Sequence, residues 1–294
     1  MNLAVVSNGC LHASQPSGLI IPWWSFTKTV LATVALSLVR DRKIGLDDKL
    51  PGDPFSLRQL LRHEAGLADY GELDEYHAAV AGNATPWSAS EMLQRLDATR
   101  LRYAPGTGWR YSNVGYMYVA NLIEQMTNLP LEEALAQRAL VPLGLSHIRL
   151  ARKTADLGGV YLGAAREYDP GWVYHGLLVG SLAEAALFLD GLLAGHLLPK
   201  ELLSEMQATH KLGGPIPGRP WAAPGYGLGL MHGTIESGLT VSGHTGSGPG
   251  SVVAVHRCVY RSKTATCAVF RDGADQGAAE ADAVERLLDI LDVN

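Results

Sequence analysis

A serine and a lysine three residues apart, Ser25 and Lys28, stand directly before a long apolar segment. The segment from Thr29 to Val39 contains no charge, no glycine and no proline, which predicts a helix that is buried on nearly all sides. A helix that begins near Trp24 has Ser25 in its first turn and Lys28 on the same face. Because burial in an apolar interior lowers the pKa of a lysine, such an amine can act as a base for a neighbouring hydroxyl nucleophile.

A structural interpretation of this pair is also open, because the spacing alone is common. Ser25 could be a helix N-cap, and the Lys28 side chain could carry its charge out to solvent. The catalytic interpretation gains weight from two further motifs that follow in order, Tyr111-Ser112-Asn113 and His244-Thr245-Gly246.

These residue types can carry out acyl transfer. The Ser25 hydroxyl can attack a carbonyl carbon, and both Lys28 and Tyr111 are candidates to accept its proton; the sequence leaves open which one does so. The oxyanion that then develops needs N–H donors. The amide of Ser25 at the helix start is one, and a residue of the strand after Gly246 would supply the other.

The three motifs together resemble the serine β-lactamase and penicillin-binding-protein superfamily, whose signature contains S-x-x-K. The Tyr-x-Asn form of the second motif is similar to that of its class C-like esterase and D-aminopeptidase branch. The resemblance extends from about residue 24 to about residue 270. Further phrases resemble the same branch: Leu60–Leu67, Gly176–Ser181 and Gly225–Gly229.

The resemblance implies a role for each motif residue. Ser25 is the expected nucleophile, Ser247 the second oxyanion donor, and Asn113 a hydrogen-bond partner of the substrate's amide or acyl oxygen. Tyr111 could instead be a core tyrosine with a satisfied hydroxyl, and Asn113 a turn or cap residue. His244 could be a strand histidine bonded to a neighbour.

His244 departs from the β-lactamase pattern, in which a lysine usually stands at this place. A histidine of ordinary pKa is mostly neutral at pH 7, so recognition of a substrate carboxylate is weakened. We therefore expect an ester, or an amide with a free amino group, rather than a β-lactam or a carboxypeptidase substrate.

The composition narrows the class of protein further. The 294 residues are 47% hydrophobic and 18% charged, as in a globular protein, and the net charge of −5 gives no footprint for a nucleic-acid partner. The N-terminal residues lack a basic region and a long apolar stretch, so we expect no signal peptide and a cytoplasmic location. No segment is long and apolar enough to predict a membrane span.

Cofactor sites are not indicated either. His63-Glu64 begins like a zinc-binding helix motif, but Leu67 stands where the second histidine is needed, so His63 is expected to be a buried histidine that holds a loop. The glycine-rich segments lack the spacing of a dinucleotide-binding loop. The three cysteines fit no metal spacing, and reduced thiols are expected, although a bridge between Cys258 and Cys267 remains open.

The order of elements predicts an α/β (α+β) fold, with an antiparallel sheet built from both termini and flanked by helices. We expect a single domain over 1–294, with an α/β lobe from about 1–45 and 225–294 and a mainly helical lobe from about 46–224. The predicted strands are Leu3–Val6, Leu239–Ser242, Ser251–Tyr260 and Thr264–Phe270. The predicted helices, besides the first, run from Ser56 to Gly66, Ser88 to Leu96, Val114 to Met126, Leu131 to Leu140, Ala183 to Leu193 and Ala274 to Leu291, with a surface loop over Gly213–Gly225.

The sequence thus predicts a β-lactamase-like serine hydrolase that cleaves a carboxylic ester or small amide through a Ser25 acyl-enzyme. A β-lactamase or a D-amino-acid-specific peptidase or amidase is the alternative within enzymes. A non-catalytic binding protein that keeps the fold is the alternative of another class. No metal or organic cofactor is implied, and association with further copies of the chain is left open.

Overall fold

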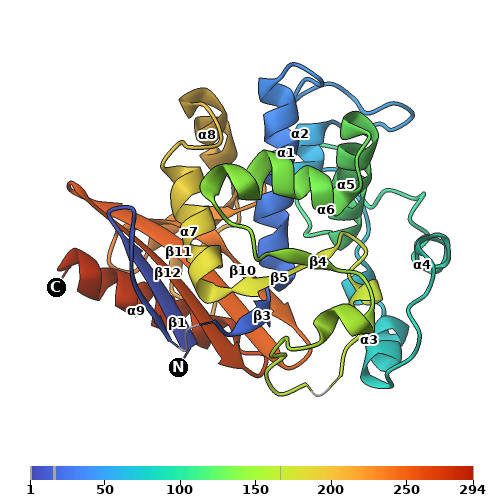
Figure 1. Cartoon of the computed structure of the whole chain (residues 1–294). Helices are drawn as coiled ribbons and strands as arrows, with labels where there is room; N and C mark the ends of the chain where they lie inside the picture. Colours follow the sequence, from blue (N-terminus) through green and yellow to red (C-terminus); the bar gives the residue numbers. More distant parts are fainter. Residues whose placement is uncertain (1, 16–17, 166, 294) are drawn as a thin grey trace.

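The structure, a computed structural model, describes residues 2–15, 18–165 and 167–293. Its large sheet has the strand order β2-β1-β12-β11-β10-β9-β8-β6, with β7 paired to β9, and neighbouring strands run antiparallel. The bounds are β1 Asn2–Ser7, β2 Cys10–Gln15, β6 His210–Lys211, β7 Trp221–Ala223, β8 Gly225–Tyr226, β9 Met231–Ile235, β10 Thr240–Gly248, β11 Ser251–Tyr260 and β12 Lys263–Asp272. Because β1 pairs with β12, both ends of the chain contribute to one sheet, as predicted (Figure 1).

Both faces of this sheet are covered, because its strands are apolar on both sides. Ala4 and Val6 of β1 belong to a core shared with α7 (Leu182–Leu193), whereas Leu3 and Val5 belong to a second core shared with α9 (Gln276–Leu291). Alternate residues of a strand point to opposite faces, so the two helices lie on opposite sides of the sheet. The α7 segment falls within the predicted helical lobe but packs against the sheet, and the division into two lobes stays a prediction.

The remaining helices and short strands lie beside the sheet (Figure 1). A second, small sheet has the order β3-β5-β4. Its strands and the other helices are β3 Ile20–Pro22, β4 Arg149–Ala151, β5 Leu177–Ser181, α1 Thr27–Arg40, α2 Leu57–Leu61, α3 Asp74–Ala81, α4 Ala89–Arg95, α5 Asn113–Thr127, α6 Leu131–Leu135 and α8 Lys200–Gln207. Short 3-10 turns are η1 Trp24–Phe26, η2 Tyr70–Glu72, η4 Val141–Leu143, η5 Thr154–Leu157 and η6 Pro170–Trp172, and a π-helical turn, η3, spans Ala136–Leu140.

Helix α1 confirms the predicted buried helix, since every residue from Thr27 to Leu38 is buried. It packs against α5, α6 and η3, and it also contacts β10 of the large sheet. An apolar helix held between a helical layer and a sheet is a rigid support for the residues of its first turn.

Two local predictions are wrong, each because tertiary packing decided the segment. Helix α2 begins at the Ser56 cap as predicted but ends at Leu61 and not at Gly66, because His63 adopts a positive φ of 61° and buries its ring. The predicted loop over 213–225 contains β7, because Trp221 is buried and donates its indole N–H to Glu280 of α9. The helix predicted from Leu131 to Leu140 is confirmed, with a change from α-helical to π-helical geometry after Leu135.

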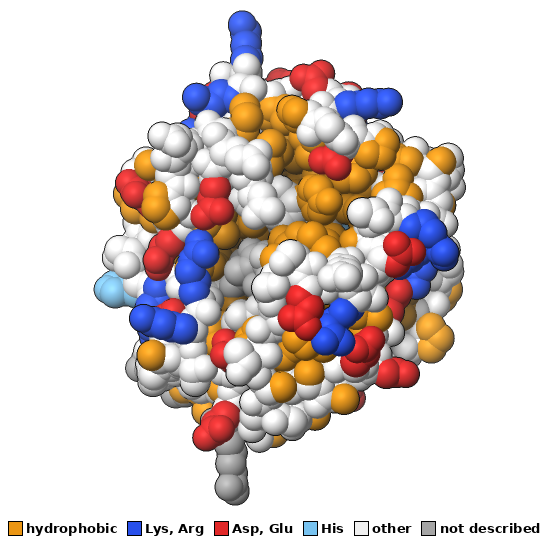
Figure 2. All heavy atoms as spheres, turned by 90° about the vertical axis from the view of Figure 1, so that its right-hand side faces the viewer, with side chains coloured by type: hydrophobic (Ala, Val, Ile, Leu, Met, Phe, Trp, Pro, Cys, Tyr) orange, Lys and Arg blue, Asp and Glu red, His pale blue; other side chains and the backbone are white. Residues whose placement is uncertain are grey.

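The cysteines and the surface complete the description. Cys258 and Cys267 are buried free thiols. On the paired strands β11 and β12, Cys258 lies opposite Ala265 and Cys267 lies opposite His256, so the bridge left open by the sequence is not formed. Within the described ranges, no helix has the length and apolarity needed to cross a membrane. One face of the molecule is hollowed near its centre, and hydrophobic side chains gather in and above the hollow (Figure 2).

Candidate active site

The candidate nucleophile lies where the start of α1 meets strand β10. Trp24, directly before Ser25, has a positive φ of 43°, a strained conformation that costs about 1–3 kcal/mol and must be held by its surroundings. Its indole is anchored by a hydrogen bond of 3.1 Å to Ser251 Oγ. Strand β10 comes so close that a Cβ on Gly246 would lie 2.7 Å from the Ser25 amide nitrogen. Only glycine allows this approach.

The structure brings the Ser25 hydroxyl into contact with both predicted proton acceptors. Lys28 Nζ lies 3.1 Å from Ser25 Oγ, and the Tyr111 hydroxyl donates to the same oxygen at 2.9 Å. The alcohol, the amine and the phenol therefore form one hydrogen-bonded cluster, although Tyr111 is 86 residues from Ser25 in the chain.

Lys28 is fully buried, which is the main physical fact about its chemistry. Its Nζ has two further partners, Asn113 Oδ1 at 2.8 Å and His175 Nε2 at 3.1 Å. Burial lowers the pKa of Lys28 to about 7, and the opposing attraction of the Asp69 carboxylate is smaller. A substantial fraction of the amine is thus unprotonated near neutral pH.

The pKa of Tyr111 is shifted in the opposite direction to the pKa of Lys28. Burial raises the pKa of the Tyr111 phenol above its ordinary value, and the hydrogen bond with Ser25 only partly opposes this. Its ring packs 4.4 Å from the ring of His63, whose Nδ1 accepts the backbone N–H of Ser112. His63 is buried and holds the Tyr111–Asn113 segment, so its predicted role as a loop-holding histidine is confirmed.

Asn113 is held in one orientation by the groups on either side of it. It is the first residue of α5, where its backbone N–H donates to Asp69 Oδ1 at 2.8 Å. Its side-chain Nδ2 donates to Asp69 Oδ2 at 3.2 Å, and its Oδ1 accepts from Lys28. The amide oxygen therefore faces Lys28, and the substrate contact expected from the resemblance stays a prediction.

His244 on β10 is a neutral residue whose ring nitrogens both have protein partners. Nδ1 lies 2.9 Å from the carbonyl oxygen of Thr245, which can only accept, so the ring proton sits on Nδ1. Nε2 then accepts from the Tyr226 hydroxyl at 2.9 Å. Burial, with a smaller contribution from Lys28, lowers the pKa of His244 to about 3, so it carries no charge at neutral pH.

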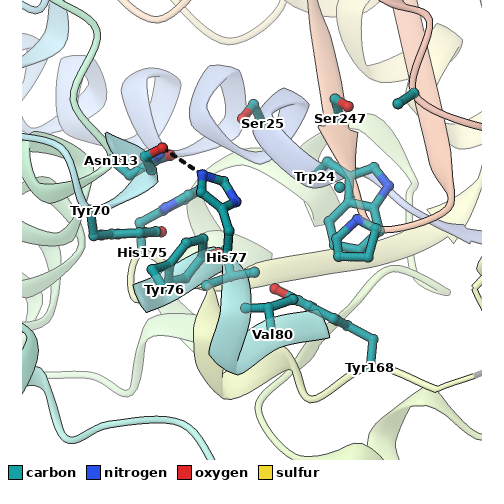
Figure 3. A pocket seen from close by; sticks show the side chains of 15 residues that line it. Trp24, Ser25, Tyr70, Tyr76, His77, Val80, Asn113, Tyr168, His175 and Ser247 are labelled. Atoms are coloured by element: carbon teal, nitrogen blue, oxygen red, sulfur yellow. Dashed lines mark hydrogen bonds between the residues drawn. The ribbon is translucent and has the colours of Figure 1, made fainter. Parts of the chain in front are cut away.

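Two cavities meet at Ser25, and Asn113 and Ser247 line both of them. The first, here called the aromatic cavity, has a volume of about 430 Å³. Its wall consists largely of aromatic rings, and Figure 3 shows Ser25 between Asn113 and Ser247, with these rings on the opposite side. The rings are those of Trp24, Tyr70, Tyr76, His77, Tyr168 and His175.

The second cavity, here called the strand cavity, has a volume of about 530 Å³ and is lined by Tyr111, Tyr226 and His244 among others. Arg219 is a lining residue with a formal charge. Its guanidinium is paired with Glu280, a fully buried carboxylate, through a hydrogen bond of 2.7 Å and a second, shorter one. This pairing compensates the positive charge on that wall.

Sequence reasoning missed two residues of the site, His175 and Asp69. His175 contacts Lys28 across 147 residues of chain, and Asp69 contacts Asn113 across 44. No spacing rule connects them to the three motifs, so only the packing of the loops before α3 and β5 could reveal them. Among the residues that the structure describes, no group of three histidine, cysteine or acidic side chains could hold a metal ion.

Comparisons with known proteins place the chain in a family. The sequence profile of the Beta-lactamase family matches residues 14–281. The chain is 34% identical over 143 residues to a D-aminopeptidase of Brucella anthropi, covering 46% of this chain and 27% of that protein. It is 36% identical over 111 residues to a D-aminopeptidase of Brucella canis, covering 37% of this chain and 21% of that protein. The matched region is thus about a quarter of the length of these relatives.

Solved structures share the fold. A D-amino acid amidase from Ochrobactrum anthropi SV3 superposes with a TM-score of 0.80 at 21% identity, covering 99% of this chain and 92% of that one. An octameric penicillin-binding protein homologue from Pyrococcus abyssi superposes with a TM-score of 0.80 at 19% identity, covering 100% of this chain and 73% of that one.

The architecture is that of the β-lactamase-like fold, and the Ser-Lys-Tyr cluster contains the residue types that a serine hydrolase uses. The chain belongs to the Beta-lactamase family. The family and the fold predicted from the three motifs are therefore confirmed, and the predicted class of enzyme agrees with them.

Proposed function

We propose that this chain is a serine hydrolase that cleaves a small, uncharged carboxylic ester or amide through an acyl-enzyme on Ser25. The observation that carries the proposal is the position of Ser25 Oγ. It is hydrogen-bonded to Lys28 and Tyr111 at the junction of two cavities. One cavity can hold the acyl group and the other the leaving group.

Lys28 is the base of the proposed mechanism. Its pKa of about 7 leaves the amine partly unprotonated at neutral pH, whereas the raised pKa of Tyr111 keeps the phenol protonated. A neutral amine can take the Ser25 proton, and a neutral phenol can only donate one. Tyr111 lines the strand cavity, where it can donate to a leaving group. The oxyanion would be held by the amides of Ser25 and Ser247.

The walls of the site support an uncharged substrate. Among the residues that the structure describes, none that lines the aromatic cavity carries a formal charge, and the Arg219 charge in the strand cavity is compensated by Glu280. The large aromatic wall favours an apolar or aromatic acyl group. The named D-aminopeptidase relatives favour, as a second candidate, amides of D-amino acids with a free amino group.

The proposal is tested with a fluorophosphonate probe, which reacts with activated serines. We expect stoichiometric labelling of the wild type, mapped to the peptide that contains Ser25 by mass spectrometry, and no labelling of Ser25→Ala. Ser7→Ala, a change on β1 away from the site, is the control and should label like the wild type. A wild type that binds an apolar ester but takes up no probe would instead indicate a non-catalytic binding protein.

The described lining residues of both cavities include no unpaired cation, and this predicts a ranking of substrates. We expect kcat/KM for p-nitrophenyl butyrate to exceed that for nitrocefin, which carries a carboxylate, by at least about tenfold, because one hydrogen bond to a charged group contributes about 1.5–3 kcal/mol. Glu280→Gln removes the partner of Arg219 and should narrow this ratio by lowering the KM for nitrocefin. The opposite ranking in the wild type would contradict our interpretation of His244 and Arg219. D- and L-aminoacyl anilides in the same panel test the second candidate.

A further inference from the structure

His175 contacts the base but belongs to none of the three motifs. It is 2% exposed and lies directly before β5, at the wall of the aromatic cavity (Figure 3). Its Nε2 is 3.1 Å from Lys28 Nζ. Its Nδ1 is buried and has no hydrogen-bond partner among the described residues. A buried ring nitrogen without a partner is unfavourable, so hydrogen bonding within the fold does not by itself explain this residue.

The protonation states of the pair follow from the number of hydrogens on Lys28. A lysine ammonium has three N–H donors and no lone pair. Lys28 Nζ has three neighbours within hydrogen-bond distance, Ser25 Oγ, Asn113 Oδ1 and His175 Nε2. With the ammonium present, Nε2 must therefore accept, and the ring proton sits on Nδ1.

The neutral amine has two N–H groups and one lone pair to distribute among the same three neighbours. Asn113 Oδ1 is held as an acceptor by Asp69, and the Nδ1-protonated form of His175 is an acceptor at Nε2. Ser25 is the neighbour with a proton to give. When both N–H groups are bound by Asn113 and His175, the lone pair is left facing the serine hydroxyl.

We propose that His175 is a positioning residue, which binds one N–H of the neutral Lys28 amine and thereby turns the lone pair toward Ser25 Oγ. This inference rests on the proposed function, since it assigns a role in preparing the same base. His175 itself stays neutral and acts through its contact with Lys28.

Other titratable groups surround the pair and bear on any pH dependence. Asp69 favours the protonated form of Lys28, and burial together with the nearby Lys28 keeps the pKa of His175 well below its ordinary value. The remaining groups that face the pair are the side chains of His63, Tyr111, Tyr116 and His244. The histidines have lowered pKa values and the tyrosines raised ones, and burial raises the pKa of the Asp69 carboxyl above its ordinary value. Lys28, with a pKa of about 7, is the group to which we assign a titration near neutral pH.

The test uses two variants of His175 whose side chains end in the same amide group but differ in length by one methylene group. In His175→Gln the amide oxygen can occupy the place of Nε2, whereas in His175→Asn the side chain ends near the place of Nδ1 and cannot reach Lys28. The readout is kcat/KM for a p-nitrophenyl ester from pH 5 to pH 9. His77→Asn is the control, because His77 lines the same cavity without contacting Lys28.

For the wild type we expect kcat/KM to fall toward acidic pH, and the midpoint of this acidic limb should lie near pH 7, because Lys28 has a pKa of about 7. His175→Asn should lower the plateau value of kcat/KM about tenfold. It should also move the midpoint of the acidic limb about half a pH unit to one pH unit lower, because the loss of the Nε2 acceptor destabilises the Lys28 ammonium more than the neutral amine. His175→Gln should recover most of the plateau and the position of the limb, and His77→Asn should leave the limb unmoved.

Two results would overturn the proposal: a limb that does not move in a folded His175→Asn variant, or a His175→Gln variant no better than His175→Asn. If His175→Asn does not fold, the test rests on His175→Gln. A midpoint of its acidic limb that lies about half a pH unit or more below that of the wild type would then overturn the proposal as well. Failure of the proposed function is distinct from both, because the wild type would then show neither probe labelling nor turnover at any pH.

Discussion

Lys28→Met is expected to lower kcat/KM for an ester substrate about ten-thousand-fold, the upper end of what general-base catalysis contributes. Methionine matches the length and apolar character of the lysine stem, so the change removes the base with little loss of packing in α1. Tyr111 cannot replace the amine as a base, because burial raises the pKa of its phenol and keeps it protonated. The measurement is steady-state hydrolysis with an active-site titration by the fluorophosphonate probe.

The same variant also tests the burial of the amine through the pH dependence of stability. The pKa of Lys28 is about 7 in the folded chain and 10.5 as the ordinary value, so between these pH values the unfolded chain binds the extra proton. The free energy of unfolding of the wild type should therefore rise, relative to Lys28→Met, by about 1.4 kcal/mol per pH unit in this window. The unfavourable contribution of Lys28 is complete below pH 7 and absent above 10.5.

Urea unfolding of both proteins at several pH values between 7.5 and 9.5 measures this slope. The matched control is Lys43→Met, because Lys43 follows the same helix but is exposed to solvent. It should retain full activity and show no such slope. A flat difference between wild type and Lys28→Met would mean that the amine is solvated, and a variant that keeps more than a tenth of the wild-type rate would exclude Lys28 as the base.

Gly246→Ala is expected to have the second largest effect, a fall in kcat of about 100-fold or more, comparable to the loss of one oxyanion donor. The added Cβ would lie 2.6 Å from the carbonyl oxygen of Trp23 and 2.7 Å from the amide of Ser25. Both contacts are with backbone, which cannot rotate away, so β10 must move from the start of α1. The distance between the amides of Ser25 and Ser247 must then increase.

Overpacking of this kind also costs about 1–3 kcal/mol of stability, so the control must separate stability from geometry. Val241→Ala serves this purpose, because Val241 is buried on the same strand but belongs to the core under α9, away from Ser25. It should lower the urea midpoint and leave kcat unchanged. If Gly246→Ala retains the wild-type kcat, the close approach of β10 is not required for catalysis.

Much of the fold follows from local patterns in the sequence. The apolar run after Lys28 predicts a buried helix, which α1 confirms, and the β-rich runs of the C-terminal third form the strands β10, β11 and β12. Capping residues such as Ser56 and Ser181 fixed where α2 and α7 begin. Segment ends were less predictable, because the end of α2 depends on the buried ring of His63 and the formation of β7 on a distant carboxylate.

The sequence by itself determined which chemical groups are available, since the order and types of the three motifs identify Ser25, Lys28, Tyr111 and Asn113. Only the tertiary structure decided how these groups are used. The pKa of Lys28, the orientation of Asn113 by Asp69 and the contact with His175 depend on burial and on neighbours 44 to 147 residues away in the chain. Protonation and hydrogen-bond direction are set by solvent exclusion and by atoms within about 3 Å, which no spacing in one sequence encodes.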